Sequence, residues 1–184
     1  MEGIQKIRDT INSYERLLEI IEKNADGDNI CKLMKKEISA LYGLSYTGTC
    51  KKLKFLLKYG LLESVNGGIS RTEKKVVQDT PLSLLPKVLL LMAKEPEVYD
   101  SLKQQAELLS VSMEDVQTAW GFYSYFFGSK YPQEEDLLQS RVIDTYYLID
   151  AKMVEKIENS ELITNVLKSK SVSTKYAQRE EKNS

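Results

Sequence analysis

The spacing of the apolar residues changes at Gly60, and this change limits the folds that the chain can adopt. Ser45 is a favourable N-cap, and the apolar positions after it recur every three or four residues, which predicts a helix from Ser45 to Gly60. The next apolar stretches, 61–65 and 69–71, flank Asn66-Gly67-Gly68 and predict a β-hairpin with a glycine turn. Because the rest of the chain has helical periodicity, we expect a mainly α fold with one small β-hairpin.

Two further helices are predicted before Ser45. Residues 3–23 carry apolar side chains at helical spacing, and residues 24–29 form a loop by their composition. A second helix is expected over 30–42, ending at Gly43, a suitable left-handed C′ residue. The apolar seam of the first helix consists of Ile4, Ile7, Ile11, Tyr14, Leu18 and Ile21.

The second half of the chain is predicted to be helical throughout. Thr72 can cap a short helix over 73–78, and Thr80-Pro81 opens the next helix as its N-cap and first helical residue. Pro86 should kink that helix or shift its start. From Lys170 onward the polar tail is expected to be disordered. The expected helices span 81–94, 97–110, 113–127, 133–158 and, with a weaker pattern, 160–169.

The composition is that of an ordinary soluble globular protein, with 42% hydrophobic and 29% charged residues. The longest apolar run, 88–93, is far shorter than the ~18 residues that suggest a transmembrane helix. The N-terminal residues lack the charged-then-apolar build of a signal peptide. We therefore expect a cytoplasmic protein with no membrane partner.

The residue types needed for common catalytic sites are missing. The chain has no histidine, which excludes Ser-His-Asp and Cys-His catalysis, and its two cysteines, Cys31 and Cys50, cannot fill a four-ligand zinc site. No Walker-type glycine loop occurs. The carboxylates at 134–136 directly follow Pro132, a position typical of the first turn of a helix. We expect a protein that is not an enzyme and that has no cofactor or metal.

Charge is unevenly distributed along the chain. The formal net charge is −1, but residues 30–75 contain 10 Lys/Arg against 3 Asp/Glu, a local excess of +7. A nearly neutral chain with one basic segment has a candidate surface for a polyanion such as nucleic acid.

The same segment contains two predicted helices joined by a glycine turn, with apolar residues positioned to face one another, which is the helix-turn-helix arrangement. These apolar residues are Ile38, Leu41, Leu44, Cys50, Leu53 and Leu57. Further marks in order are Glu37-Ile38, Gly43-Leu44-Ser45, Leu53, Tyr59-Gly60-Leu61-Leu62 and Ser70-Arg71-Thr72-Glu73-Lys74.

With these marks, residues 30–78 resemble the winged helix-turn-helix superfamily of bacterial and archaeal regulators, which includes MarR-, ArsR- and PadR-like proteins. The resemblance implies a small hairpin wing after the recognition helix, and binding to double-stranded DNA. Together with the helical periodicity of the second half, we expect a DNA-binding domain over 1–79, a helical dimerisation or effector region over 80–169 and a disordered tail over 170–184.

The predicted recognition helix offers specific side chains for this binding. Thr47, Lys51, Lys54 and Lys58 lie on one line, about a quarter turn from the line of Cys50, Leu53 and Leu57. Lysines would contact phosphates, and residues at the helix start would read bases in the major groove. Hairpin residues would reach the neighbouring minor groove or its phosphates. The candidate DNA-binding residues are Ser45, Tyr46, Thr47, Thr49, Lys51, Lys52, Lys54, Lys58, Asn66 and Arg71.

Several features allow a second interpretation. The lysine line could be a merely solvated helix face. Residues 101–127 also scan as a helix-turn-helix, but their second helix is acidic at its start and rich in aromatic residues, which favours a core or interface helix; an aromatic ligand site is the alternative. Cys50 could be a redox switch, although a cysteine on an apolar line is usually a small hydrophobe.

We expect a homodimer, because one winged helix covers too few base pairs for high specificity. Its seam would be residues 4–21, residues 138–157, or both. The favoured function is a sequence-specific transcriptional regulator, with no prediction for a small-molecule effector. The alternatives are a plasmid or phage replication or segregation protein, and a protein-interaction module that does not bind DNA.

Overall fold

The protein is described here by a computed structural model, in which residues 2–65, 67–98 and 100–128 are described. Several predictions concern residues outside these ranges. They are Asn66, the carboxylates at 134–136, the helices over 133–158 and 160–169, the seam over 138–157 and the tail from Lys170.

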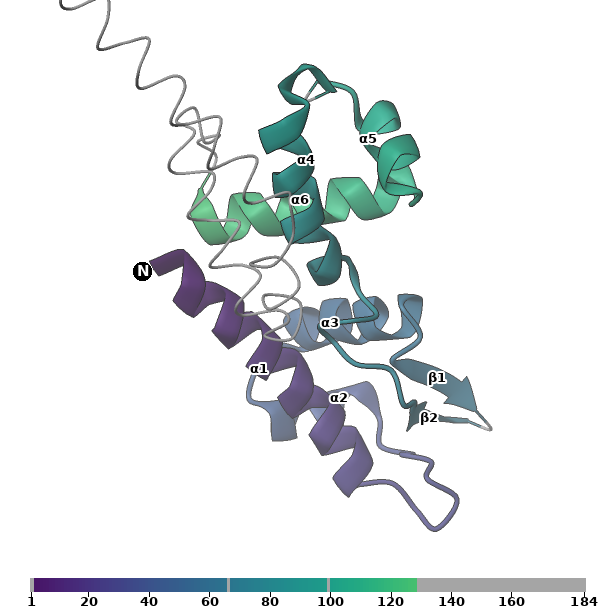
Figure 1. The fold of residues 1–184 in the computed structure, drawn as a ribbon. Coiled ribbons are helices and arrows are strands. Elements are labelled where there is room, and N and C mark those ends of the chain that lie inside the picture. Colours follow the sequence, from purple (N-terminus) through teal and green to yellow (C-terminus); the bar gives the residue numbers. More distant parts are fainter. Residues whose placement is uncertain (1, 66, 99, 129–184) are drawn as a thin grey trace, which may run out of the picture. The chain divides into compact units, whose positions relative to one another are not determined.

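The described part is mainly helical with one two-stranded antiparallel hairpin, which confirms the expected fold class at this level (Figure 1). In the hairpin, Leu62 pairs with Arg71 and Val65 with Gly68. The first elements are α1 (Glu2–Lys23), α2 (Lys35–Tyr42), α3 (Tyr46–Lys58), β1 (Leu62–Val65) and β2 (Gly68–Arg71). They are followed by η1 (Pro81–Leu84), α4 (Leu85–Lys94), η2 (Pro96–Val98), α5 (Leu102–Leu109) and α6 (Met113–Phe127).

Local sequence signals explain most of the helix ends. Gly43 after α2 and Gly60 after α3 have the left-handed φ angles, 76° and 71°, that favour glycine at helix C-termini. Thr80 accepts a hydrogen bond from the Leu82 amide and caps η1, as predicted. Pro86 lies in the first turn of α4, where its missing N–H has no intrahelical acceptor, so the proline shifts the helix start instead of kinking it.

The predicted helix over 30–42 is wrong in its first part, since α2 begins only at Lys35. Cys31 is instead extended and pairs antiparallel with Ile69 of β2, through backbone hydrogen bonds of 2.8 and 3.0 Å. Pairing with the hairpin satisfies the backbone of this buried residue without a helix.

Two other predicted helices are corrected. The segment 73–78 forms turns and no helix, because the Thr72 hydroxyl donates to the Gly60 carbonyl at 2.7 Å and ties the segment to the end of α3. The helix expected over 97–110 is shorter, since a 3₁₀ turn at Pro96–Val98 precedes it and Ser101 caps α5.

Most of the apolar seam of α1 is buried within the chain itself, while Ile11 is only partly buried. Ile7, Leu18 and Ile21 have no exposed surface and Tyr14 is 8% exposed, because α1 packs against α2, β2 and α6 (Figure 1). Most of residues 4–21, which the sequence offered as a dimer seam, thus pack against the same chain.

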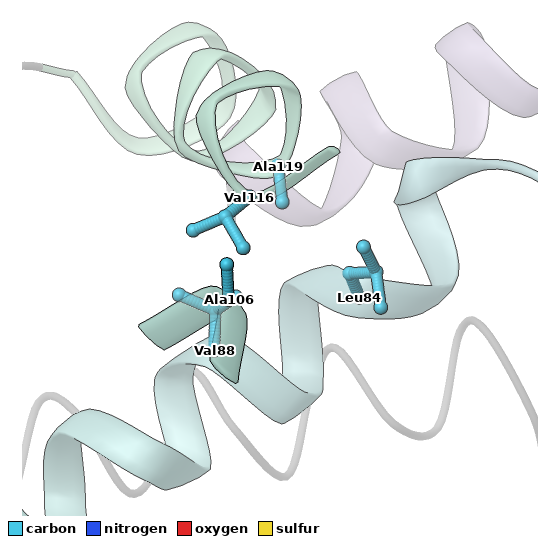
Figure 2. Packing of buried hydrophobic residues seen from close by; sticks show 5 residues of the cluster. All are labelled: Leu84, Val88, Ala106, Val116 and Ala119. Atoms are coloured by element: carbon cyan, nitrogen blue, oxygen red, sulfur yellow. The ribbon is translucent and has the colours of Figure 1, made fainter. Parts of the chain in front are cut away.

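The helices after the hairpin share a second cluster of buried residues. Figure 2 shows its side chains pointing toward one another from η1, α4, α5 and α6. The contacts of α6 with α1 also link the segments on either side of residue 79. The cluster consists of Leu84, Val88, Ala106, Val116 and Ala119. Within the described ranges, no helix combines the length and the apolar character needed to cross a membrane.

Candidate nucleic-acid interface

The turn between α2 and α3 is held by side-chain hydrogen bonds. The Ser39 hydroxyl donates to the Leu44 carbonyl at 2.8 Å, and Ser45 caps α3 by accepting from the Gly48 amide at 3.1 Å. The predicted cap at Ser45 is confirmed. These bonds fix where α3 starts, and hence which of its faces is buried.

The buried face of α3 differs from the predicted line. Thr49, Leu53 and Leu56 are 0–2% exposed, whereas Cys50 and Leu57 are only partly buried. At 100° per residue the observed buried line lies about half a turn, and not a quarter turn, from the line of lysines. The buried side chains and the lysines of α3 thus lie on opposite faces of the helix, instead of on adjacent faces as the sequence indicated.

The outward face of α3 carries the predicted line. Thr47, Lys51, Lys54 and Lys58 are all exposed. The ammonium groups of Lys51 and Lys54 have no ion-pair partner among the described residues. Two cations on neighbouring turns of one helix therefore face solvent.

Lys58, by contrast, is paired. Its Nζ lies 2.6 Å from Oε1 of Glu114, and this hydrogen bond raises the pKa of Lys58. The pair joins the end of α3 to the first turn of α6. A phosphate would have to compete with this carboxylate for the lysine.

Lys52 also points elsewhere. Its Nζ lies 4.1 Å from the centre of the Tyr14 ring on α1, and burial lowers the pKa of the ammonium group. A partly buried cation over an aromatic face belongs to the packing between α1 and α3. Lys52 is therefore not part of the exposed line.

Thr49 must be removed from the predicted DNA-binding residues. Its side chain is fully buried, and its Oγ1 has no hydrogen-bond partner among the described residues. Tyr46, also predicted to read bases, is 55% exposed, and a hydrogen bond with the Cys50 thiol raises the pKa of its hydroxyl. The structure thus leaves Tyr46 and Thr47 accessible at the start of α3 and withdraws Thr49.

Arg71 on β2 is held by α1. Its guanidinium lies 2.5 Å from a carboxylate oxygen of Glu22 and 3.5 Å from one of Glu15. Glu15 and Glu22 are seven residues apart and so lie on one face of α1. This double ion pair fastens the hairpin to α1 and reduces the positive charge that the hairpin offers to a partner.

Phe55 and Tyr59, whose place the sequence did not explain, dock α3 between two helices. Phe55 stacks on Tyr14 of α1 with ring centres 4.8 Å apart, and meets Phe122 of α6 edge to face at 5.9 Å. The Tyr59 hydroxyl donates to Asp115 of α6 at 3.1 Å. Side chains from both ends of the described chain thus set the orientation of α3.

The α5–α6 pair does not resemble a second DNA reader. Val116, Tyr123 and Phe126 of α6 are buried, and Trp120 Nε1 donates to Oε1 of the buried Gln105 at 2.7 Å. The interpretation of this segment as a core helix agrees with these contacts.

Sequence reasoning missed three further cations. Lys35, Lys36 and Lys75 are exposed and form no ion pair with described residues. The signal was present as the Lys35-Lys36 pair, which was counted in the net charge but not placed at the start of α2.

The described residues hold no group of three or more Cys, Asp or Glu side chains arranged to bind a metal ion. Comparison of the chain with family models, with curated proteins and with solved structures found no match.

Proposed function

We propose that residues 30–78 form a winged helix-turn-helix and that the protein binds double-stranded DNA as a homodimeric transcriptional regulator. In this proposal α3 enters the major groove and the β1–β2 hairpin contacts the adjacent backbone. The observation that carries it is the exposed, unpaired state of Lys51 and Lys54 on the face of α3 opposite its docked side.

The charge that remains after internal pairing supports a polyanionic partner. Of the ten cations in 30–75, Lys32, Lys58 and Arg71 are neutralised by carboxylates. The exposed cations without a described ion-pair partner are Lys35, Lys36, Lys51, Lys54, Lys74 and Lys75, of which Lys74 donates to the Tyr59 carbonyl. A phosphate backbone gains affinity from such unpaired cations through the release of counterions.

Base reading falls to Tyr46 and Thr47 at the N-terminal end of α3. Both are exposed, and both lie one or two turns before the lysines, as expected of a helix that enters a groove end-on. Ser45 is committed to capping through its oxygen, although its hydroxyl can still donate to an acceptor. In this arrangement Arg71 contacts no base, and its ion pairs with α1 hold the hairpin in position.

Dimerisation follows from the size of the target, because one such module covers too few base pairs. Because most of the seam of α1 packs within the chain, we propose residues 138–157, alone or together with residues 4–21, as the contact between copies. The arrangement of bound sites, an inverted pair or a tandem array, separates a transcriptional regulator from a replication or segregation protein.

A salt titration tests DNA binding directly. We expect affinity for duplex DNA to fall with salt, with a log–log slope of about −0.9 per phosphate contact. The Lys51→Glu/Lys54→Glu variant should bind much more weakly and with a shallower slope. The matched control, Lys87→Glu/Lys94→Glu, makes the same charge change at two exposed positions of α4. If both variants lost the same amount of DNA affinity, the loss would be an effect of net charge, and α3 would no longer be assigned as the helix that contacts DNA.

A second candidate function is a protein-interaction module. It is favoured by exposed apolar side chains at the turn between α2 and α3. Leu41 is 50% and Leu44 is 46% exposed, and Tyr46 is adjacent. If a protein docks there, Leu41→Ser/Leu44→Ser should abolish its binding while Lys51→Glu/Lys54→Glu leaves it intact.

A further inference from the structure

An open cleft of about 460 Å³ lies between α1, α3 and α6. Its volume is within the ~300–1,000 Å³ typical of small-molecule sites. Four aromatic side chains contribute to its lining, one from α1, one from α3 and two from α6. They are Tyr14, Phe55, Phe122 and Tyr125. Such a lining favours a flat, largely apolar ligand.

One cation also lines the cleft. Lys52 is half-buried, no carboxylate of the described residues pairs with it, and it contacts the face of the Tyr14 ring. Burial lowers its pKa, which is the sign of an ammonium group that has lost water without gaining an anion. An anionic group placed beside Lys52 would supply the missing partner, whereas a second cation would be repelled.

Gly121 provides the space. It lies in the interior of α6, where glycine is less favourable than alanine. A Cβ at this position would meet no described atom within 4 Å, so neither close packing nor a left-handed backbone requires glycine. The missing side chain leaves this wall of the cleft open.

We propose that the cleft binds a small planar aromatic carboxylate, with its ring against Phe55 and Phe122 and its carboxylate at the Lys52 ammonium. A neutral aromatic compound would fill the same space but leave Lys52 without an anion. A comparison of a charged and a neutral ligand with the same ring system therefore distinguishes this site from a surface that is only apolar. The proposal does not depend on DNA binding.

The test is calorimetric titration of the full chain, without DNA, with 2-naphthoate and with the neutral 2-naphthalenemethanol. We expect one saturable site that prefers 2-naphthoate by roughly tenfold or more, since a hydrogen bond to a charged group adds that much. Lys52→Gln should remove the preference. The control Lys51→Gln, the same change at the neighbouring exposed lysine, should keep it.

A steric pair of variants provides an independent check. Gly121→Ala adds one methyl group and should still bind, while Gly121→Leu should fill the cleft and abolish binding. Both should keep the wild-type helical circular dichroism, since each replaces a helix-interior glycine at an open position. No saturable binding of 2-naphthoate at millimolar concentration, equal effects of Lys51→Gln and Lys52→Gln, or undiminished binding by Gly121→Leu would each overturn the proposal.

Discussion

Nζ of Lys58 lies 2.6 Å from Oε1 of Glu114, so the last turn of α3 is joined to the first turn of α6. Beside this pair, Tyr59 donates to Asp115, the next residue of α6. The proposed DNA-reading helix is thus attached at its C-terminal end to an acidic helix start. In the proposed complex, the ion pair with Glu114 keeps Lys58 from binding a phosphate.

Replacing this carboxylate should strengthen DNA binding. In Glu114→Gln the lysine is free to contact phosphate, so the salt dependence should become steeper by about 0.9 in log–log slope. The control is Glu107→Gln, which removes the carboxylate partner of Lys103 on α5. Salt titrations that give the same slope for Glu114→Gln and wild type would contradict a role for Lys58 at the interface.

Arg71 should matter more for the hairpin than for DNA affinity. Its guanidinium is held by Glu15 and Glu22, so Arg71→Gln should release β2 from α1 and speed hydrogen exchange of the Ile69 amide. Its affinity for DNA should fall less than that of Lys51→Gln. A larger loss of affinity in Arg71→Gln, with unchanged exchange at Ile69, would show that the arginine contacts DNA directly.

Thr49→Val should stabilise the protein. The buried Oγ1 has no described partner, so removing it should raise the free energy of unfolding by about 1 kcal/mol. Urea unfolding measures this change, and Thr47→Val at an exposed position provides the comparison. DNA affinity should not change in Thr49→Val. A destabilised variant would mean that the hydroxyl has a partner.

Stability should fall in alkaline solution through Tyr14. Burial, reinforced by Tyr42 and Tyr59, raises the pKa of Tyr14 to about 12 from 10.0. The folded state therefore keeps a proton that the unfolded state loses, so this stabilisation is complete below pH 10 and disappears as pH approaches 12.

Urea unfolding of wild type and Tyr14→Phe at pH values of about 9 and about 11 measures this effect. The wild type should lose more stability over this interval, because phenylalanine has no proton to lose. Parallel losses in the two proteins would show that Tyr14 titrates normally.

Features with local causes were predictable. The helix over 113–127 was predicted with the bounds that α6 has, and α3 lies where Ser45 and Gly60 placed it. The hairpin was also predicted, except that Gly68, expected in the turn, is the first residue of β2 and pairs with Val65. Capping, left-handed glycine and apolar period depend on residues a few positions apart. The alignment of Lys51 and Lys54 on one line of α3 belongs to this class, because it follows from helical geometry alone.

Errors arose where a distant segment decided the outcome. Residues 30–34 are not helical, because Cys31 pairs with Ile69, which follows α2 and α3 in the sequence. Thr49 is inside because α3 turns its 49–53–56 face to the core, although Cys50 and Leu57 gave an equally apolar alternative. Composition could not rank these two faces.

The sequence by itself determined most of the described elements of this protein and the basic character of residues 30–75, since these depend on short-range order and on residue type. Tertiary packing alone decided which of those charges remain available. Lys52 rests on Tyr14, Lys58 on Glu114 and Arg71 on two glutamates of α1, while Lys51 and Lys54 have no described counterion. The reason is physical: ion pairing and burial depend on distances of a few ångströms between residues far apart in the chain, and those distances exist only once the helices have packed.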